Sequence, residues 1–221
     1  ISIDKKIHIR ILKTEDTGDV DFLVYGYQNR GNYEGMFGIV GYHFEKENNI
    51  LQEMFYIPVK SSFDQLKEDL ERLTYQSSSG MLYLYLDHAI YGIDRESNES
   101  MVVADGLEEE SYAVSMDQAR IAWQEGGKRF GASVLHLLDL ETGEKYDIRG
   151  GENEYVRTLG FVGRDLVYGM TRSGDSWISN GRLQGFPMYA VEIMNDEKQR
   201  ETRYEKEGYY VDGVTVEDSR I

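Results

Sequence analysis

The fold is decided by a repeated motif whose clearest copy is Leu137-Leu138-Asp139-Leu140-Glu141-Thr142-Gly143-Glu144. A looser copy occupies Gly92–Glu99, and two weaker copies occupy Val191–Glu197 and His43–Asn49. Each copy reads as a strand that ends in an acidic residue, followed by a polar turn and another strand. These acidic residues stand 49, 45 and 53 positions apart along the chain and are Glu45, Asp94, Asp139 and Glu192.

A strand-only repeat of roughly 40–50 residues is typical of propeller blades, because each small sheet must stack on its neighbours to bury its faces. A second marker has the same period: short strands that end in an aromatic residue occur at Phe22–Tyr25, Ile121–Trp123 and Leu166–Tyr168. The sequence therefore predicts an all-β fold, a β-propeller or partial propeller of about four to five four-stranded blades. The alternative is a β-sandwich in which the spacing is coincidental.

The repeats predict where the blades and one interruption lie along a single propeller domain, 1–221. Ser62 and Gln65 form a capping-box pattern, and apolar residues then recur at helical spacing, so a short helix is expected at 62–73. The last repeat stops early, which leaves open a fragment of a larger propeller or a closed ring of four blades. The expected blades are 19–59, 74–105, 111–149, 155–205 and a partial one at 208–221.

Composition restricts the classes of partner. The net charge is -16 and no basic run is present, which argues against nucleic acid and anionic membrane surfaces. The chain contains no cysteine, so disulfides and thiolate chemistry are excluded. No stretch approaches 18 consecutive apolar residues, so no transmembrane helix is expected. The chain opens with Ile1 and without a signal-peptide pattern, as a processed or truncated chain would.

The segment 171–187 is the candidate ligand-binding loop. It is longer than its equivalents in the other repeats, and long loops on rigid scaffolds often bind ligands. An exposed Trp beside Arg and Asp would suit a sugar or a peptide. The alternative is a long hairpin whose Trp tucks onto the blade. The candidate ligand-binding residues are Arg172, Asp175, Trp177, Arg182 and Phe186.

Catalytic and metal-binding patterns were sought and none is predicted. The four histidines do not lie at metal-ligand spacing, and no Gly-x-Ser-x-Gly motif is present. With 40 acidic residues, pairs of carboxylates cannot identify a glycosidase. We therefore expect no catalytic residue, no metal site and no cofactor, and leave open whether the chain is an enzyme.

The third repeat resembles the bacterial TolB-type, WD40-like propeller repeat. The resemblance is carried by Ser111–Asp117, by Arg120–Trp123 and by the motif Leu137–Glu144, with Gln118 in place of the usual Gly. The whole chain also resembles uncharacterised exported or lipid-anchored proteins of Gram-positive bacteria. The resemblance implies a recognition platform at an extracytoplasmic site, on the cell surface or lipid-anchored. A cytoplasmic location is the alternative.

These observations predict a propeller module that binds a protein, a peptide or a glycan at the bacterial cell surface. One alternative is a glycan-active or lyase-like enzyme with its site on the propeller face. Another is a regulatory propeller that belongs to a catalytic domain outside this chain. A homodimer is expected if the propeller is incomplete, because an open blade would expose an apolar face.

Overall fold

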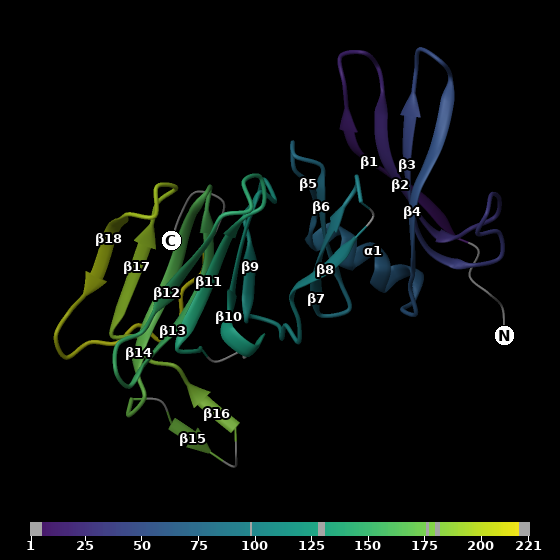
Figure 1. Cartoon of the computed structure of the whole chain (residues 1–221). Helices are drawn as coiled ribbons and strands as arrows, with labels where there is room; N and C mark the ends of the chain where they lie inside the picture. Colours follow the sequence, from purple (N-terminus) through teal and green to yellow (C-terminus); the bar gives the residue numbers. More distant parts are fainter. Residues whose placement is uncertain (1–5, 98, 128–130, 176, 180–181, 217–221) are drawn as a thin grey trace. The chain divides into compact units, whose positions relative to one another are not determined.

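The computed structural model describes residues 6–97, 99–127, 131–175, 177–179 and 182–216. Its elements are four four-stranded antiparallel sheets, a two-stranded hairpin, one α-helix and one short 3-10 turn (Figure 1). Each four-stranded sheet is built from strands in chain order, which is the arrangement of a propeller blade. The predicted fold class, an all-β propeller-type fold with one short helical insertion, is confirmed.

The chain divides into two compact units, residues 1–103 and 104–221. The first unit holds sheets 1 and 2 with the helix between them. Its elements, in chain order, are β1 (Ile7–Thr14), β2 (Val20–Tyr27), β3 (Phe37–Glu45) and β4 (Ile50–Pro58) in sheet 1, then α1 (Phe63–Arg72), then β5 (Thr74–Gln76), β6 (Met81–Leu86), β7 (Ala89–Asp94) and β8 (Ser100–Ala104) in sheet 2. Sheet 1 takes in β1, which the repeat pattern places ahead of the first blade.

Helix α1 fills the core of the first unit. Ser62 caps it by accepting a hydrogen bond from the Gln65 backbone N–H at 3.2 Å. The Gln65 side chain does not complete a capping box, because it donates to Asp69 Oδ1 at 2.8 Å. The apolar face of α1 packs between one face of sheet 1 and one face of sheet 2, and the buried members of this cluster are Leu23, Tyr25, Ile39, Phe63, Leu66, Leu70, Leu82, Leu84, Leu86 and Ile93.

The second unit holds sheets 3 and 4, and the hairpin is inserted in sheet 4. Its elements, in chain order, are β9 (Tyr112–Val114), β10 (Arg120–Gln124), η1 (Glu125–Gly127), β11 (Val134–Asp139) and β12 (Lys145–Arg149) for sheet 3, then β13 (Glu154–Val162), β14 (Asp165–Arg172), β15 (Trp177–Ser179), β16 (Arg182–Gly185), β17 (Ala190–Met194) and β18 (Arg200–Glu205) for sheet 4 and its hairpin. Sheet 4 keeps the order β13-β14-β17-β18, because β15 and β16 pair only with each other.

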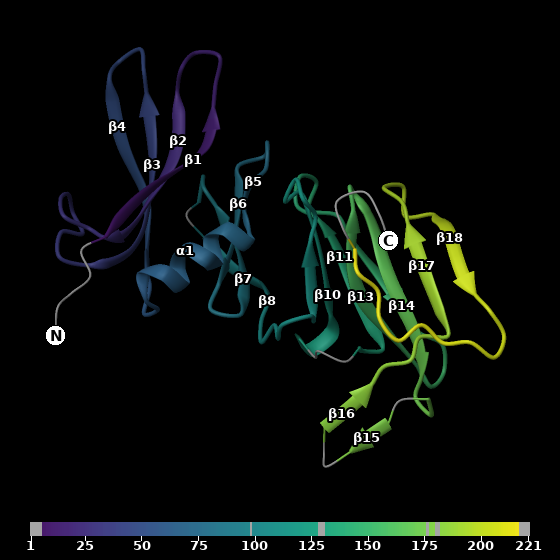
Figure 2. The same ribbon diagram turned by 180° about the vertical axis from the view of Figure 1, so that it is seen from behind.

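Both faces of sheet 4 are covered within its own unit. One face packs on sheet 3 and includes Leu166, Tyr168 and Met194. The other face carries Val167 and Val191, and it is covered by half-buried valines of the C-terminal segment, which are Val211, Val214 and Val216. Figure 2 shows this segment running in front of β13 and β14. In residues 208–216 the segment forms a single bridge, Val211 to Met188, rather than the strand of a further sheet.

The repeated motif is a turn held by a side chain at the end of the third strand of a blade. Asp139 Oδ1 accepts the backbone N–H groups of Glu141 and Thr142 at 3.0 and 2.9 Å, and Asp94 accepts two N–H groups in the same way. In sheet 4 this place is taken by Asn195, whose Oδ1 accepts the Gln199 N–H at 2.9 Å. Glu192, the acidic residue that the motif spacing selects, instead lies inside β17.

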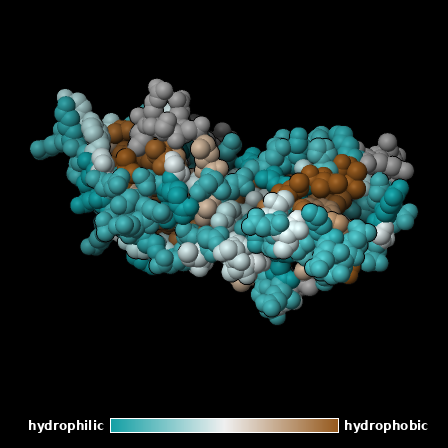
Figure 3. All heavy atoms as spheres, turned by 90° about the horizontal axis from the view of Figure 1, so that it is seen from above, coloured by the Kyte–Doolittle hydropathy of each residue, from teal (hydrophilic) through white to brown (hydrophobic). Residues whose placement is uncertain are grey.

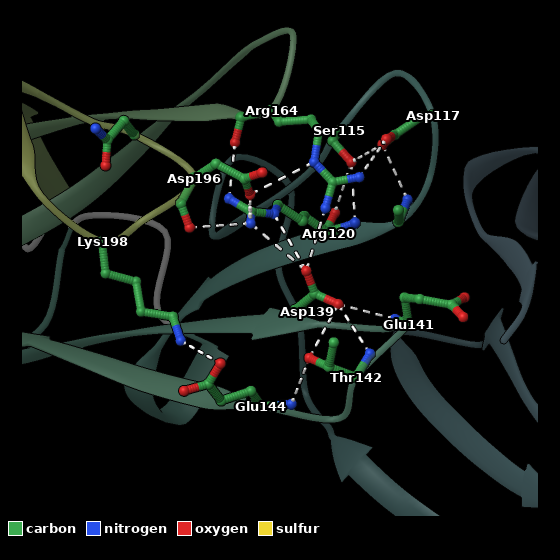
Figure 4. A network of polar contacts seen from close by, with 12 residues as sticks. Ser115, Asp117, Arg120, Asp139, Glu141, Thr142, Glu144, Arg164, Asp196 and Lys198 are labelled. Atoms are coloured by element: carbon green, nitrogen blue, oxygen red, sulfur yellow. Dashed lines mark hydrogen bonds and ion pairs between the residues drawn. The ribbon is translucent and has the colours of Figure 1, made fainter. Parts of the chain in front are cut away.

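A charge network centred on the buried Arg120 and Asp139 joins sheets 3 and 4 (Figure 4). Arg120, near the start of β10, contacts Asp139 across the sheet and reaches Asp196 in the β17–β18 turn. Arg164, in the β13–β14 turn, pairs with Asp139 Oδ2 at 3.2 Å and with Asp117 at 3.1 Å. The Asp139 carboxylate therefore caps its own turn with one oxygen and binds the next sheet with the other.

Sheets 1 and 2 are joined at the corresponding place with the charges exchanged. Asp21, near the start of β2, accepts two hydrogen bonds from the Arg95 guanidinium, at 2.5 and 2.8 Å. His43 and Gln76 also bond this carboxylate, at 2.7 and 2.9 Å. Arg95 directly follows the turn-capping Asp94, just as Asp196 follows Asn195. In both units, an ion pair thus links the second strand of one sheet to the last turn of the next, through Asp21 and Arg95 in the first unit and through Arg120 and Asp196 in the second.

Candidate functional site

The connection between β14 and β17 forms the hairpin β15–β16, which is the segment that the sequence predicts as a binding loop. Trp177 pairs with Gly185 and Ile178 with Leu183, with a bulge between the two pairs. Trp177 and Arg182 therefore lie on the two strands of the hairpin. Their side chains lie outside the part of the structure that is described, so they stay predicted site residues.

Arg172 and Asp175 stand at the base of the hairpin. The Arg172 guanidinium lies over the Tyr189 ring, 4.0 Å from its centroid, and about half of the side chain is exposed. Asp175 Oδ2 is 3.8 Å from Arg172 Nη1, and the Asp175 N–H donates to the Arg172 carbonyl at 3.0 Å. A cation held flat on an aromatic ring keeps its orientation while its outer N–H donors remain directed to solvent.

Tyr189 holds this base in place. Its hydroxyl donates to Glu154 Oε1 at 2.8 Å, and its backbone N–H donates to the Met170 carbonyl at 3.0 Å. Burial raises the pKa of Tyr189, and the hydrogen bond to Glu154 raises it further. The ring therefore stays neutral and gives Arg172 a fixed surface on which to stack.

Beneath Tyr189, a row of three polar side chains crosses sheet 4. Tyr168, Glu192 and Arg203 are direct neighbours on β14, β17 and β18. The Tyr168 hydroxyl donates to the buried Glu192 carboxylate, which also pairs with Arg203. Burial opposes ionisation of Glu192, but the Tyr168 hydroxyl and the Arg203 charge outweigh it and hold its pKa below the usual value. This row cannot be predicted from the sequence, because its members are 24 and 11 residues apart and only strand register brings them together.

Phe186 is buried in the core of the second unit. It packs with Val167, Met188 and Val191 on the outer face of sheet 4. Next to it, the Thr171 hydroxyl donates to the Pro187 carbonyl at 2.5 Å. Phe186 and Pro187 therefore anchor the returning leg of the hairpin, and the exposed part of the candidate site begins at Arg172 and Asp175.

The histidines do not converge on one place. His43 bonds Asp21 in sheet 1, and His136 bonds Asp147 in sheet 3 at 2.7 Å. In the described part of the chain, no group of three or more His, Cys, Asp or Glu side chains is arranged to hold a metal ion. Across the same residues, no helix is long and apolar enough to cross a membrane.

The first unit contains a cavity of about 560 Å³ between the end of β4, α1 and the β6–β7 turn. Its walls are largely apolar and include Ile57, Pro58 and Tyr91. The buried Asp69 also lines it, but each of its carboxylate oxygens accepts a hydrogen bond, one from Gln65 and one from the Asp87 N–H. Asp69 thus ties α1 to the turn.

Comparisons with known proteins identify no relative by sequence: no protein-family model matches the chain, and no curated protein matches it. Among solved structures, it is similar to the tricorn protease, with 16% identity, a TM-score of 0.40 and coverage of 88% of this chain and 18% of that one.

The oligogalacturonate lyase from Vibrio parahaemolyticus matches with 12% identity and a TM-score of 0.30, over 90% of this chain and 59% of that one. TolB from Acinetobacter baumannii matches with 10% identity and a TM-score of 0.27, over 92% and 64%. The chain spans less than two thirds of the length of each of these three proteins. At these scores the similarities do not bear on activity.

Proposed function

We propose that the chain is a propeller-type recognition module that binds a peptide or glycan ligand through the β15–β16 hairpin and its base. The observation that carries the proposal is the half-exposed Arg172, stacked on Tyr189 at the foot of a hairpin that, among the residues described, is inserted in sheet 4 and in no other sheet. The broader assignment, a propeller module, rests on the four blade-type sheets.

The chemistry of the base suits a ligand that presents flat polar groups. The guanidinium of Arg172 offers several N–H donors in one plane, which match a carboxylate, a backbone carbonyl or the hydroxyls of a sugar. Asp175 places a negative charge beside it, because its Oδ2 lies 3.8 Å from Arg172 Nη1 and helps to hold the guanidinium. Trp177 and Arg182 are the hairpin residues predicted to add a stacking surface and a second cation.

A rigid base favours binding, because little side-chain entropy is then lost when the ligand arrives. The Tyr189–Glu154 bond and the Thr171–Pro187 bond hold the two ends of the hairpin on sheet 4. The row of Tyr168, Glu192 and Arg203 lies beneath these bonds, and the Glu192 charge is paired with Arg203 within the row. The row therefore supports the site, and Arg172 is the half-exposed cation at its base.

The cellular location of the chain and the binding of whole proteins are proposals that rest on the resemblance to exported bacterial propellers. We propose that the ligand is met at the cell surface, and that a protein would be bound through an exposed peptide segment of its own. The two alternatives, an enzyme on the propeller face and a regulator of a separate catalytic domain, stay predictions.

Peptide and glycan arrays probed with the whole chain, followed by calorimetry on the ligand found, test this function. Arg172→Ala and Trp177→Ala should each weaken binding about tenfold or more, because each removes a directional contact. Arg149→Ala is the matched control, since this exposed arginine lies on β12 and pairs only with Asp147 among the contacts described. Binding that survives both hairpin substitutions would reject the site, and turnover of the ligand would favour the enzyme.

A further inference from the structure

The outer face of sheet 1 carries a run of uncharged, mostly apolar side chains on β1, β2 and β3. Strand register places Ile9, Val24, Val40 and Tyr56 in one row across the sheet. In the next row Ile11 lies opposite Phe22, whose ring stacks on Tyr42 at 5.4 Å. We call this surface the β1 face and define it by its exposed or half-buried members on β1, β2 and β3, which are Ile9, Ile11, Phe22, Val24 and Tyr42. On β4 the second row ends in the charged Glu53, and the Tyr33 ring stacks on Tyr56.

The β1 face is open to solvent, whereas the opposite face of sheet 1 forms the core with α1. Ile9 is 68% exposed and Ile11 is 63% exposed. No member of the β1 face is charged, although the chain carries 24 basic and 40 acidic residues. Figure 3 shows hydrophobic residues gathered over the part of the surface that sheet 1 forms. A contiguous apolar surface without charge is typical of a surface that another protein covers.

The packing of sheets 2 and 4 indicates what kind of surface covers the β1 face. The corresponding face of sheet 4, with Leu166 and Tyr168, is covered by the apolar face of sheet 3. The corresponding face of sheet 2, with Leu82 and Leu84, is covered by sheet 1 and α1. Sheets 2 and 4 therefore bury the corresponding face against another apolar sheet. We expect the β1 face to be covered by an apolar sheet face as well.

We propose that the β1 face binds the β1 face of a second copy of the chain, which gives a closed dimer with two-fold symmetry. The outer face of sheet 4 is the other surface that a neighbouring blade would use, but Val211, Val214 and Val216 already cover it. A head-to-tail contact would have to displace this segment. An isologous contact displaces nothing, and it closes after two copies.

Sedimentation velocity over a wide range of protein concentration tests the dimer. The unaltered chain should show a monomer–dimer equilibrium that added salt does not weaken, because the β1 face contributes no ion pairs and salt screens the repulsion between two copies of net charge -16. The double variant Ile9→Asp, Ile11→Asp should raise the dimer dissociation constant about 100-fold or more, and Ile9→Thr should give a smaller rise while it keeps a strand-forming residue.

The matched control is Ile50→Asp, which changes an isoleucine of similar exposure that strand register places on the opposite side of sheet 1. It should leave the dissociation constant unchanged. A chain that stays monomeric at every concentration, or one whose double variant associates as tightly as the unaltered chain, would overturn the proposal.

Disulfide cross-linking tests the two-fold symmetry of the dimer. The natural chain contains no cysteine, so an introduced cysteine can pair only with its copy in a second chain. Single cysteine substitutions at Ile9, Ile11, Phe22 and Val24, made one at a time, should include one that gives a disulfide-linked dimer on oxidation, since residues beside a two-fold axis meet their own copies. Ile50→Cys should stay monomeric under the same conditions. Equal cross-linking at Ile50, or polymers longer than a dimer in sedimentation, would contradict the isologous contact.

Discussion

Gln118 adopts a left-handed backbone conformation, with φ at 58°. It lies in the turn between β9 and β10, where the Ser115 hydroxyl donates to Asp117 and accepts the Arg120 N–H at 2.9 Å. The family that the third repeat resembles has Gly at this position. A side chain with a Cβ costs free energy in this region of backbone space, so Gln118 is a site of local strain.

Gln118→Gly is therefore expected to raise the free energy of unfolding by up to about 1 kcal/mol, the difference between the relieved strain and the added freedom of the unfolded chain. Urea titration followed by circular dichroism measures it. Gln118→Ala is the control, because it keeps the Cβ and should not stabilise. A Gly variant no more stable than the Ala variant would show that the turn carries no strain.

The buried carboxylate of Asp21 makes the first unit sensitive to acid. Burial opposes its ionisation, but hydrogen bonds from Gln76 and His43 and the Arg95 charge hold its pKa below the ordinary value of 3.8. A carboxyl whose pKa is lowered by folding stabilises the folded state above its ordinary pKa. This contribution is lost as the pH falls through the folded pKa.

Asp21→Asn is expected to cost about 3 kcal/mol at pH 7, since it leaves Arg95 without its charge partner. The difference between the variant and the natural chain should begin to shrink as the pH falls below about 4, because Asp21 of the unfolded chain then binds a proton, and the contribution of the charge is lost once the pH has passed the lower folded pKa. Urea unfolding at a series of pH values measures this. A difference that is constant from pH 7 to pH 3 would mean that the Asp21 charge contributes nothing.

At the scale of elements, helix α1 shows which local patterns can be read from sequence. Ser62 at the cap and the helical spacing of Phe63, Leu66 and Leu70 predict both its type and its buried face. For segment 171–187 the sequence leaves a binding loop and a long hairpin as alternatives, and the register of the β15–β16 hairpin depends on a bulge that the residues do not signal. Trp177 and Arg182 could be chosen by residue type, whereas the stacking of Arg172 on Tyr189 could not be predicted.

Leu70→Ala should lower the free energy of unfolding of the first unit by about 2–5 kcal/mol, because this fully buried side chain would leave a cavity between α1 and sheet 2. Hydrogen exchange of peptides from α1 and β6 measures the loss. Val102→Ala, at an exposed position of β8 in the same unit, is the control and should change exchange little. Unchanged protection of α1 in the Leu70 variant would contradict the role of the helix as core.

At the scale of the whole molecule, the C-terminal segment covers the outer face of sheet 4, on which a neighbouring blade could otherwise pack. The predicted partial fifth blade at 208–221 falls on this segment, of which residues 208–216 are described. In these residues, three valines cover the outer face of sheet 4 in place of strand pairing. Repeat proteins need such caps, since an uncovered terminal repeat presents an apolar face to solvent.

Val211→Asp combined with Val214→Asp should therefore lift the segment and change the closed dimer into open-ended polymers, because two different apolar faces would then be available. Sedimentation velocity and light scattering measure the size. Adding Ile9→Asp and Ile11→Asp to the same chain should abolish polymers, as one face is lost again. A valine variant that remains a simple dimer would show that the segment does not cap sheet 4.

The sequence by itself determined the blades, because strand period, turn chemistry and helix capping act over a few residues. The motif at Leu137–Glu144 is a turn whose Asp139 accepts its own backbone N–H groups, and such contacts are local. Only the tertiary structure decided the partners between sheets, such as Asp21 with Arg95, 74 residues apart. Strand register and the stacking of sheets determine which faces pack together. They place Glu192 in a buried ion pair and Phe186 in the core of the second unit, and they leave the β1 face exposed.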